Sequence, residues 1–299
     1  VRNHYLSVEP AMRGWVSAVA NYSEPVAIGA VMRSLAAGRI AESKHPEFRA
    51  GDLVTGWFGW QDYAAVPAKA VESRVTDTDL PLSAALGVLG LNGITAYFGL
   101  LDVGQVKSGD TVVVSTAAGA VGSCVGQIAK IKGGRTVGIA GGAEKVRLCR
   151  EEFGYDVAID YKNVDIDAAL AAACPDGLDV YFDNTAGAIS DAVHRHLRVG
   201  ARIVICGTAS IASWDPAPSG PRVERHLLTK RARMQGILIF DYAARFAEAR
   251  ESLAQWVRNG TLRYREDILD GIDRAPGAIA GLYRGENLGK RLIRLAQEG

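Results

Sequence analysis

A glycine-rich stretch is the part of this sequence best suited to chemistry. An apolar run, TVVVST (111–116), is followed by AAGAVG (117–122) and then by a longer apolar segment. The spacing approximates the dinucleotide fingerprint G-x-G-x-x-G, with Ala117 in place of the first glycine. Gly119 would let the backbone approach a pyrophosphate, and Gly122 would let a helix pack close to a sheet. Because helix N-termini bind phosphate, the turn predicts a nucleotide site.

Two other interpretations of this stretch are open. A glycine-rich turn between a strand and a helix can be purely structural, and the hydropathy over 111–127 resembles that of a membrane segment. A membrane helix would not carry this much Gly, Ser and Thr at its centre and then run into Lys130 and Lys132. The nucleotide interpretation is favoured because the turn is the first in a long series of alternating strands and helices.

The residues after the next strand indicate which dinucleotide binds. An NAD site has an acidic residue there, roughly 20 positions after the turn, which holds the ribose 2′-hydroxyl. This sequence has Gly141–Gly142 instead, followed by Lys145 and Arg147. The glycines leave room for a 2′-phosphate and Lys145 supplies a cation, although a lone lysine on a helix is commonly only solvated. The sequence therefore predicts NADP(H) as the cofactor.

Alternating strands and helices must position these residues. The alternation runs from about residue 85 to 255, and its strands are rich in Val and Ile. Such runs are typical of strands buried on both faces of a parallel sheet, so we expect a doubly wound α/β domain. The predicted strands span 111–116, 135–140, 157–161, 179–184, 201–207 and 236–240, and the predicted helices span 120–132, 143–153, 165–173, 187–197, 221–232 and 243–258.

The segments on either side of this series have a different pattern. Residues 1–82 are β-like and punctuated by turns, and the pattern after residue 258 is irregular. The first residues alternate like a strand and do not begin with Met. We therefore expect a β-rich domain around the α/β domain, with the chain beginning part-way through it.

The composition argues against several classes of protein. A formal charge of +1 gives no reason to expect nucleic acid or an anionic membrane as a partner. The first residues show no secretory-signal pattern, and no other segment is apolar enough to span a bilayer. The four cysteines, at positions 124, 149, 174 and 206, are too widely spaced for a zinc site. We expect a cytoplasmic protein with reduced thiols and no bound metal.

Eight segments resemble a known family. The chain resembles the zinc-independent medium-chain dehydrogenase/reductases, in particular the branch of prostaglandin reductases and plant alkenal double-bond reductases. The segments run in the family order over nearly the whole chain, and they are specific together although not singly. They are YLSVEPAMRG (5–14), GWQDYAAV (59–66), LGLNGITAYFGLLDVG (89–104), AAGAVGSCVGQIAKIKG (117–133), AGGAEK (140–145), YFDNTAG (181–187), CGTAS (206–210) and GENLGK (285–290).

The resemblance implies an architecture and an assembly. A Rossmann NADP-binding domain over 85–257 would be inserted in a GroES-like substrate domain formed by 1–84 and 258–299, from which an N-terminal segment is absent. It also implies a homodimer joined through the Rossmann sheets. The predicted strand at 236–240 could lie at a sheet edge, where pairing across a twofold axis would cover it.

The resemblance also implies a set of cofactor contacts. The pyrophosphate turn would be formed by Gly119, Ala120, Val121 and Gly122. The 2′-phosphate would be held by Lys145 and Tyr161. The remaining contacts, mostly on the nicotinamide side, would be Asn184, Cys206, Gly207, Thr208, Ala209, Ser210, Ile237, Leu238, Ile239 and Asn287. Without the family, Asn184 is equally well explained as a loop cap, and Asn287 as part of a turn.

Two positions depart from the family pattern. Ala11 stands where the motif DPYMR has a tyrosine, and Ala212 stands where another tyrosine follows the CG pair. Both changes would enlarge the substrate pocket and remove a phenol. They leave the identity of the substrate undecided and have less effect on the binding of NADPH. From Ala212 we expect a preference for bulky, apolar enones over small alkenals.

The activity implied by the resemblance is NADPH-dependent reduction of the C=C bond of α,β-unsaturated ketones or aldehydes. Hydride would reach the β-carbon, and negative charge would develop on the carbonyl oxygen. No proton donor is assigned, since packing explains Tyr63 and Tyr97 as well as catalysis does. A quinone reductase and a non-catalytic NADPH-binding protein remain alternatives, whereas a zinc alcohol dehydrogenase is disfavoured by the missing Cys and His ligands.

Overall fold

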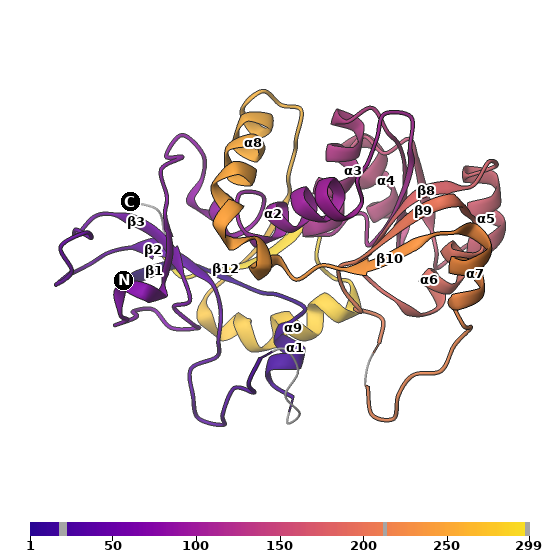
Figure 1. Ribbon diagram of the computed structural model, residues 1–299. Coiled ribbons are helices and arrows are strands. Elements are labelled where there is room, and N and C mark those ends of the chain that lie inside the picture. Colours follow the sequence, from indigo (N-terminus) through magenta and orange to yellow (C-terminus); the bar gives the residue numbers. More distant parts are fainter. Residues whose placement is uncertain (18–22, 212–213, 297–299) are drawn as a thin grey trace. The chain divides into compact units, whose positions relative to one another are not determined.

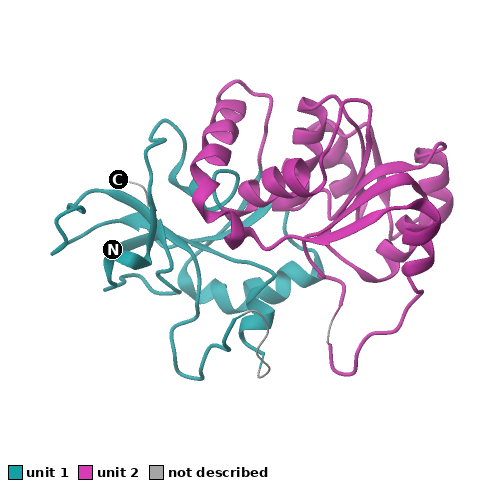
Figure 2. Cartoon of the chain, in the orientation of Figure 1, with its two compact units in different colours: residues 1–90, 265–299 teal, residues 91–264 magenta. Residues whose placement is uncertain are grey.

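The chain forms two compact units. The computed structural model describes residues 1–17, 23–211 and 214–296. One unit contains Val1–Gly90 and Arg265–Gly299, and the other contains residues 91–264 (Figure 2). The chain therefore begins one unit, forms the whole of the other and then returns to the first. The domain boundaries expected at 84/85 and 257/258 remain predictions.

A parallel sheet forms the centre of the 91–264 unit. Its strands lie in the order β10-β9-β8-β5-β6-β7, and every pairing between them is parallel. This is the doubly wound α/β sheet that the alternating pattern predicted. The strands are β5 (Thr111–Ser115), β6 (Arg135–Ala140), β7 (Val157–Asp160), β8 (Leu178–Asp183), β9 (Leu197–Ile205) and β10 (Arg233–Gly236).

Helices cover both faces of this sheet (Figure 1). Leu170, Val193 and Leu227, from α5, α6 and α7, pack with Val113 and other strand residues on one face. The opposite face is covered by α3 and α4, which explains why the strands are apolar on both sides. The helices are α2 (Leu91–Phe98), α3 (Ala120–Ile131), α4 (Ala143–Glu151), α5 (Ile166–Ala173), α6 (Gly187–His194), α7 (Glu224–Lys230) and α8 (Phe246–Arg258), with a π-helix η3 (Gly99–Val103) and a 3₁₀ helix η4 (Ile239–Arg245).

The last predicted strand is wrong in its position. β10 ends at Gly236, where the predicted strand begins, and η4 starts at Ile239. The true strand, RMQG, is polar and largely exposed because it lies at the edge of the sheet. Apolar runs indicate buried strands, so the pattern pointed to the following GILIF instead.

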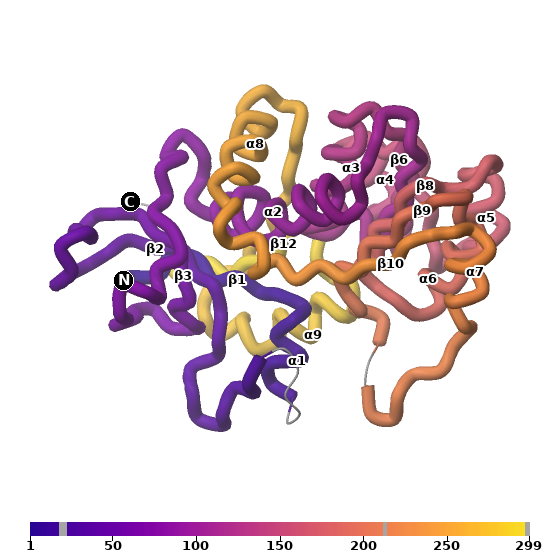
Figure 3. Tube along the Cα trace, in the orientation of Figure 1, coloured from indigo at the N-terminus to yellow at the C-terminus, as the bar shows by residue number. Residues whose placement is uncertain are grey.

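The other unit contains a mixed sheet that the C-terminal segment completes. Its order is β11-β12-β1-β2-β3-β4, and β12 pairs antiparallel with β1, with Tyr5 opposite Arg294. Figure 3 labels β1, near the start of the chain, and β12, near its end. Leu6, Val54 and Ile293 lie in its core. The strands are β1 (Arg2–Ser7), β2 (Ala36–Arg39), β3 (Leu53–Gly56), β4 (Val71–Arg74), β11 (Glu266–Asp270) and β12 (Lys290–Arg294), and the helices are α1 (Met12–Trp15) and α9 (Ala275–Arg284), with 3₁₀ turns η1 (Ala68–Ala70), η2 (Leu82–Leu86) and η5 (Ile272–Arg274).

Candidate dinucleotide-binding site

The carboxyl ends of β5 and β8 mark the point where a doubly wound sheet binds its ligand. The chain moves from β5 through β6 to β7, and then crosses to β8 on the other side of β5. The loops after β5 and β8 therefore lead to opposite faces of the sheet, which leaves a crevice at the strand ends. The last residues of these two strands, Ser115 and Asp183, are both buried.

The glycine-rich turn connects β5 to α3 in a conformation that its residue types require. Thr116 has a positive φ of 54°, and its carbonyl accepts a hydrogen bond of 2.9 Å from the Gly119 amide. A Cβ on Gly122 would overlap that same carbonyl oxygen and would lie 3.0 Å from Ala117 Cα. Gly122 therefore allows the start of α3 to pack against the end of β5, as the spacing predicted.

The structure also explains why alanine is tolerated at the first position of the fingerprint. Ala117 is fully buried, and its amide donates to the Ile139 carbonyl at 3.0 Å. A Cβ on Gly138, in the neighbouring strand β6, would lie 2.8 Å from the Ala117 Cβ. The missing side chain at Gly138 therefore provides the space that Ala117 fills.

The start of α3 presents donors without partners. Gly119 is the N-cap residue and provides no side-chain cap. Within the described ranges, the amides of Ala120, Val121 and Gly122 donate to no protein acceptor, as is usual for the first turn of a helix. Together with the positive end of the helix dipole, these amides fit a pyrophosphate.

The open space that a 2′-phosphate needs lies at the end of β6, beside Gly142, where an added Cβ would meet nothing within 4 Å. Gly141 and Gly142 follow the strand, and Gly142 has a φ of 98° that favours glycine. A Cβ on Gly141 would lie 2.9 Å from both Tyr161 Cε1 and Lys162 Cε. Tyr161 and Lys162 therefore lie against the Gly141 backbone, and Lys145 follows in the first turn of α4.

Lys162 is a candidate phosphate ligand that the sequence analysis missed. Among the described residues, no carboxylate lies within ion-pair distance of its ammonium group, although its charge contributes to the lowered pKa of Asp160. The nearest acid in sequence is Asp160, whose carboxylate accepts hydrogen bonds from Gly142 N at 2.8 Å and Asn163 Nδ2 at 2.8 Å. The Gly142 hydrogen bond, followed by the one from Asn163, holds the pKa of Asp160 below its ordinary value. A lysine directly after Tyr161 was the available signal.

The loops after β8 and β9 are joined by hydrogen bonds. Asn184 donates from its backbone amide to Ser115 Oγ at 2.8 Å and from Nδ2 to the Ser115 carbonyl at 2.7 Å. Ala209 N donates to the Asn184 carbonyl at 3.2 Å, and Ser210 Oγ donates to the Thr185 carbonyl at 2.8 Å. The structure therefore brings Asn184 and the segment 206–210 together at the carboxyl edge of the sheet.

The remaining predicted contacts lie in two places. Ile237 N donates to the Ile205 carbonyl at 3.0 Å, so the segment 237–239 follows β10 at the same edge. Asn287 lies in the other unit, where its Nδ2 donates to the Gly289 carbonyl at 2.8 Å. Its proposed cofactor contact remains a prediction.

The two tyrosines considered as proton donors have different surroundings. Tyr97 packs edge-on against Phe98 with ring centroids 5.1 Å apart, and its hydroxyl donates to Glu248 Oε1 at 3.3 Å. Tyr63 is 62% exposed. Ala11 is partly buried against the core of its unit, and Ala212 lies outside the described residues. These environments favour a packing role for Tyr97 and assign no proton donor.

The environment of Cys206, at the carboxyl end of β9, excludes a thiolate at neutral pH. Burial, followed by the nearby Asp183 carboxylate, raises the pKa of its thiol to about 12. Burial likewise raises the pKa of Cys124 and Cys149 to about 12, and that of Cys174 above its ordinary value. All four thiols are free and therefore remain protonated.

We expect the native protein to resist alkylation at these cysteines. At pH 8, a thiol with a pKa near 12 is ionised to only about one part in 10⁴. Iodoacetamide treatment followed by mass spectrometry should find little label on the native chain and four labels after unfolding in urea. Rapid native labelling of Cys206 at pH 8 would contradict this assignment.

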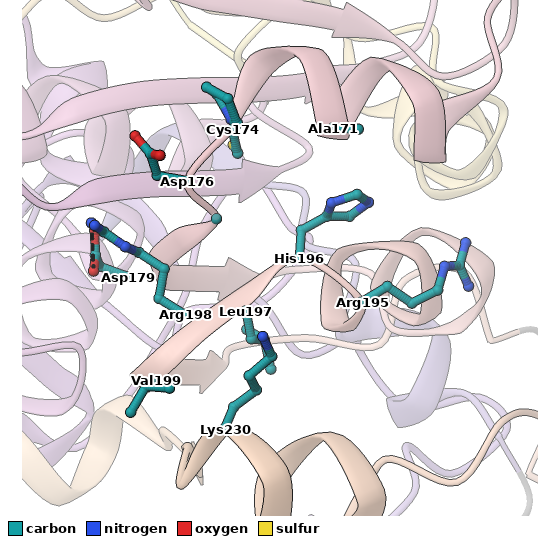
Figure 4. A pocket seen from close by; sticks show the side chains of 12 residues that line it. Ala171, Cys174, Asp176, Asp179, Arg195, His196, Leu197, Arg198, Val199 and Lys230 are labelled. Carbon is teal, nitrogen blue, oxygen red and sulfur yellow. Dashed lines mark hydrogen bonds and ion pairs between the residues drawn. The ribbon is translucent and has the colours of Figure 1, made fainter.

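An open depression lies at the opposite edge of the sheet, near the amino ends of β8 and β9 (Figure 4). Three of its basic side chains are already engaged, because Arg198 pairs with Asp179 at 3.1 Å and both Arg195 and His196 contact Asp167. Ligands of doubly wound sheets bind at the carboxyl ends of the strands. The carboxyl ends of β5 and β8 are therefore a better candidate ligand site than this depression.

The described part of the chain shows neither a membrane-spanning helix nor a cluster of metal ligands. No helix there is both long and apolar enough to cross a membrane. Three or more His, Cys, Asp or Glu side chains do not gather there in a group that could hold a metal ion.

The fold and site define a two-unit protein with a doubly wound dinucleotide-binding domain. Two family models match the chain, "N-terminal domain of oxidoreductase" over residues 1–73 and "Zinc-binding dehydrogenase" over residues 120–256. The chain belongs to the medium-chain dehydrogenase/reductase family, in its zinc-independent branch.

Relatives and solved structures match over almost the whole chain. The NADPH-dependent curcumin reductase of Escherichia coli is 44% identical, covering 99% of this chain and 87% of the relative. The NADP⁺-dependent 2-alkenal reductase of Nicotiana tabacum is 39% identical, covering 100% and 87%. The structure of CurA from Vibrio vulnificus in complex with NADPH is 42% identical, with a TM-score of 0.91 and coverage of 99% and 89%.

Proposed function

We propose that the chain is an NADPH-dependent reductase of the C=C bond of α,β-unsaturated ketones and aldehydes. The observation that carries this proposal is the arrangement after β5 and β6. There the amides of the first turn of α3 have no acceptor among the described residues, and Tyr161 and Lys162 lie against Gly141. The similarity to a curcumin reductase and a 2-alkenal reductase supports the substrate class. When bound, NADPH supplies the hydride, which the chain itself does not contain.

In this proposal, the residues of the chain bind and orient the cofactor. The amides of Ala120, Val121 and Gly122 hold the pyrophosphate, and Lys145, Tyr161 and Lys162 hold the 2′-phosphate. The residues proposed to contact the nicotinamide side are Asn184, Cys206, Gly207, Thr208, Ala209, Ser210, Ile237, Leu238 and Ile239, and a contact from Asn287 stays a prediction. The Cys206 thiol contributes as a neutral group, because its raised pKa keeps the proton in place.

The direct test is NADPH consumption with a panel of enones, quinones and enoyl thioesters. We expect enones and enals to be reduced, with the saturated carbonyl compound as product by mass spectrometry. Turnover of quinones without enones would select the quinone-reductase alternative. Tight NADPH binding without turnover of any class would select a non-catalytic role.

We also propose that two copies of the chain associate along β10. This strand has a neighbour on one side only, so its outer main-chain groups are available for pairing. Leu238 and Phe240, which follow it, are 41% and 42% exposed and would add apolar surface.

The four unpaired cysteines favour a reducing, cytoplasmic location for such a protein.

A proline in the edge strand should weaken this dimer. We expect light scattering to give twice the chain mass for the parent at micromolar concentration. Gln235→Pro should shift the protein toward the monomer, because proline removes one donor and disturbs edge pairing. Gln235→Thr is the matched control and should remain dimeric. A monomeric parent would contradict the proposed assembly.

A further inference from the structure

The carboxylate of Asp183, at the end of β8, is the most heavily hydrogen-bonded group in the crevice. Asp183 is 1% exposed, and no lysine or arginine of the described chain pairs with it. Its Oδ1 accepts from the Thr185 amide at 2.8 Å, the Ala186 amide at 2.9 Å and the Tyr181 hydroxyl at 3.1 Å. Its Oδ2 accepts from Ser190 Oγ at 2.6 Å. A buried charge without a cation is costly, so these donors are what stabilise it.

One of these hydrogen bonds goes to a strained residue. Ala186 has a φ of 58° and a ψ of −164°, a region of the backbone map that is occupied almost only by glycine. Such a conformation persists only where its surroundings enforce it. The bond from Ala186 N to Asp183 Oδ1 and the bond from Ser210 Oγ to the Ala186 carbonyl, at 3.1 Å, are the contacts that do so.

Asp183 also makes contacts with the end of β5 and with the loops after β8 and β9. Ser115 Oγ lies 3.4 Å from Asp183 Oδ1 and receives the Asn184 amide at 2.8 Å. The Asp183 carbonyl accepts from the amides of Cys206 at 2.8 Å and Gly207 at 3.1 Å. These two bonds go to the main chain, so a side-chain substitution leaves them in place. Loss of the carboxylate would act directly on segment 184–186 and, through the Ala186 carbonyl that Ser210 Oγ contacts, on segment 206–210. Its nearest link to the glycine-rich turn is the 3.4 Å contact with Ser115 Oγ, and no hydrogen bond among the described residues links it to Gly141.

We propose that Asp183 is a positioning residue that holds segments 184–186 and 206–210 in the shape required by the nicotinamide half of the cofactor. This inference rests on the proposed function, since it assumes that NADPH binds in the crevice. The adenosine half of a dinucleotide lies over the first β-α-β unit, which here contains β5, β6 and Gly141, and the nicotinamide half lies on the other side of the switch point. Asp183 should therefore affect one half of the ligand and not the other.

The test compares two ligands by titration calorimetry. NADPH contains both halves, whereas 2′,5′-ADP contains only the adenosine half with its 2′-phosphate. We expect Asp183→Ala to weaken NADPH binding about tenfold, since hydrogen bonds to a charged group are lost, while the Kd for 2′,5′-ADP stays within about twofold. Asp183→Asn keeps one acceptor and should give an intermediate Kd for NADPH.

Asp179→Asn is the matched control. Asp179 lies on the same strand, and its Oδ2 likewise accepts a main-chain amide, from Thr111 at 2.9 Å, but at the opposite edge of the sheet. The Asp179→Asn substitution should leave the affinities for NADPH and for 2′,5′-ADP unchanged. Should Asp183→Ala not fold, as judged by circular dichroism, Asp183→Asn and Ser190→Ala carry the same comparison of the two ligands.

Equal weakening of NADPH and 2′,5′-ADP binding would show that Asp183 only stabilises the fold. Unchanged binding of both ligands would show that Asp183 does not position the segments that hold the nicotinamide half. Either result overturns the inference while leaving the proposed function intact. A parent protein that binds 2′,5′-ADP but not NADPH would overturn the proposed function, and the inference with it.

Discussion

NADPH is expected to bind about tenfold to a hundredfold more tightly than NADH, which is the range for one to two charge-assisted hydrogen bonds to a phosphate. The space beside Gly142 and the lysines at 145 and 162 are the reasons for this preference. Lys145→Ala and Lys162→Ala should each weaken NADPH binding about tenfold and leave NADH binding nearly unchanged. The substitutions lower the affinity for the two cofactors by different amounts, because only NADPH carries the 2′-phosphate.

Titration of both cofactors against the parent and the variants measures this preference. Lys107→Ala is the control, because it removes the same charge from the loop that precedes the amino end of β5. The affinity for NADPH should also fall with added salt more steeply than that for NADH, since phosphate contacts are screened. Equal affinities of the parent for the two cofactors would refute the assignment of the 2′-phosphate site.

The second large effect is expected at Gly122. An alanine there would overlap the Thr116 carbonyl, which is main chain and cannot rotate away, so the start of α3 would have to move. We expect Gly122→Ala to lower the Tm by several degrees, corresponding to about 1–3 kcal/mol, and to abolish measurable NADPH binding at micromolar concentration.

Gly119→Ala separates the two roles of the turn. A Cβ there would meet mainly the Thr116 methyl group, at 2.9 Å, and the backbone angles at Gly119 suit any residue. The Tm should therefore change little, while NADPH binding should weaken because the added methyl group faces the pyrophosphate. Thermal unfolding and calorimetry on both variants test this contrast. A stable Gly122→Ala variant with the Kd of the parent would show that the turn does not hold the cofactor.

The features predicted from the sequence are those determined by neighbouring residues. The Val-rich runs indicated β5 and β8 because buried parallel strands must be apolar on both faces. The spacing of Gly119 and Gly122 indicated the turn because a side chain at Gly122 would overlap the Thr116 carbonyl. The last strand was misplaced because β10 lies at the edge of the sheet and is polar.

The features that could not be predicted depend on the order of strands in the sheet. Lys162 lies beside Gly141 only because β7 pairs with β6, and Asn184 contacts Ser115 only because β8 pairs with β5. The contacts of Asp183 with Ser115 and with segment 206–210 likewise depend on the pairing of β8 with β5 and β9. Local sequence carried one weak signal for Asp183, a polar residue at the end of a buried strand.

The position of β12 between β11 and β1 has a consequence for the order in which the protein can fold during synthesis. The 91–264 unit is continuous in sequence, so it can fold as soon as residue 264 has left the ribosome. β1 is made before this unit and its partner β12 after it, roughly 15 to 60 s later at ordinary rates of translation. During that interval the apolar strand β1 lacks one of its neighbours, and the nascent chain should be a substrate for chaperones until β12 has been made.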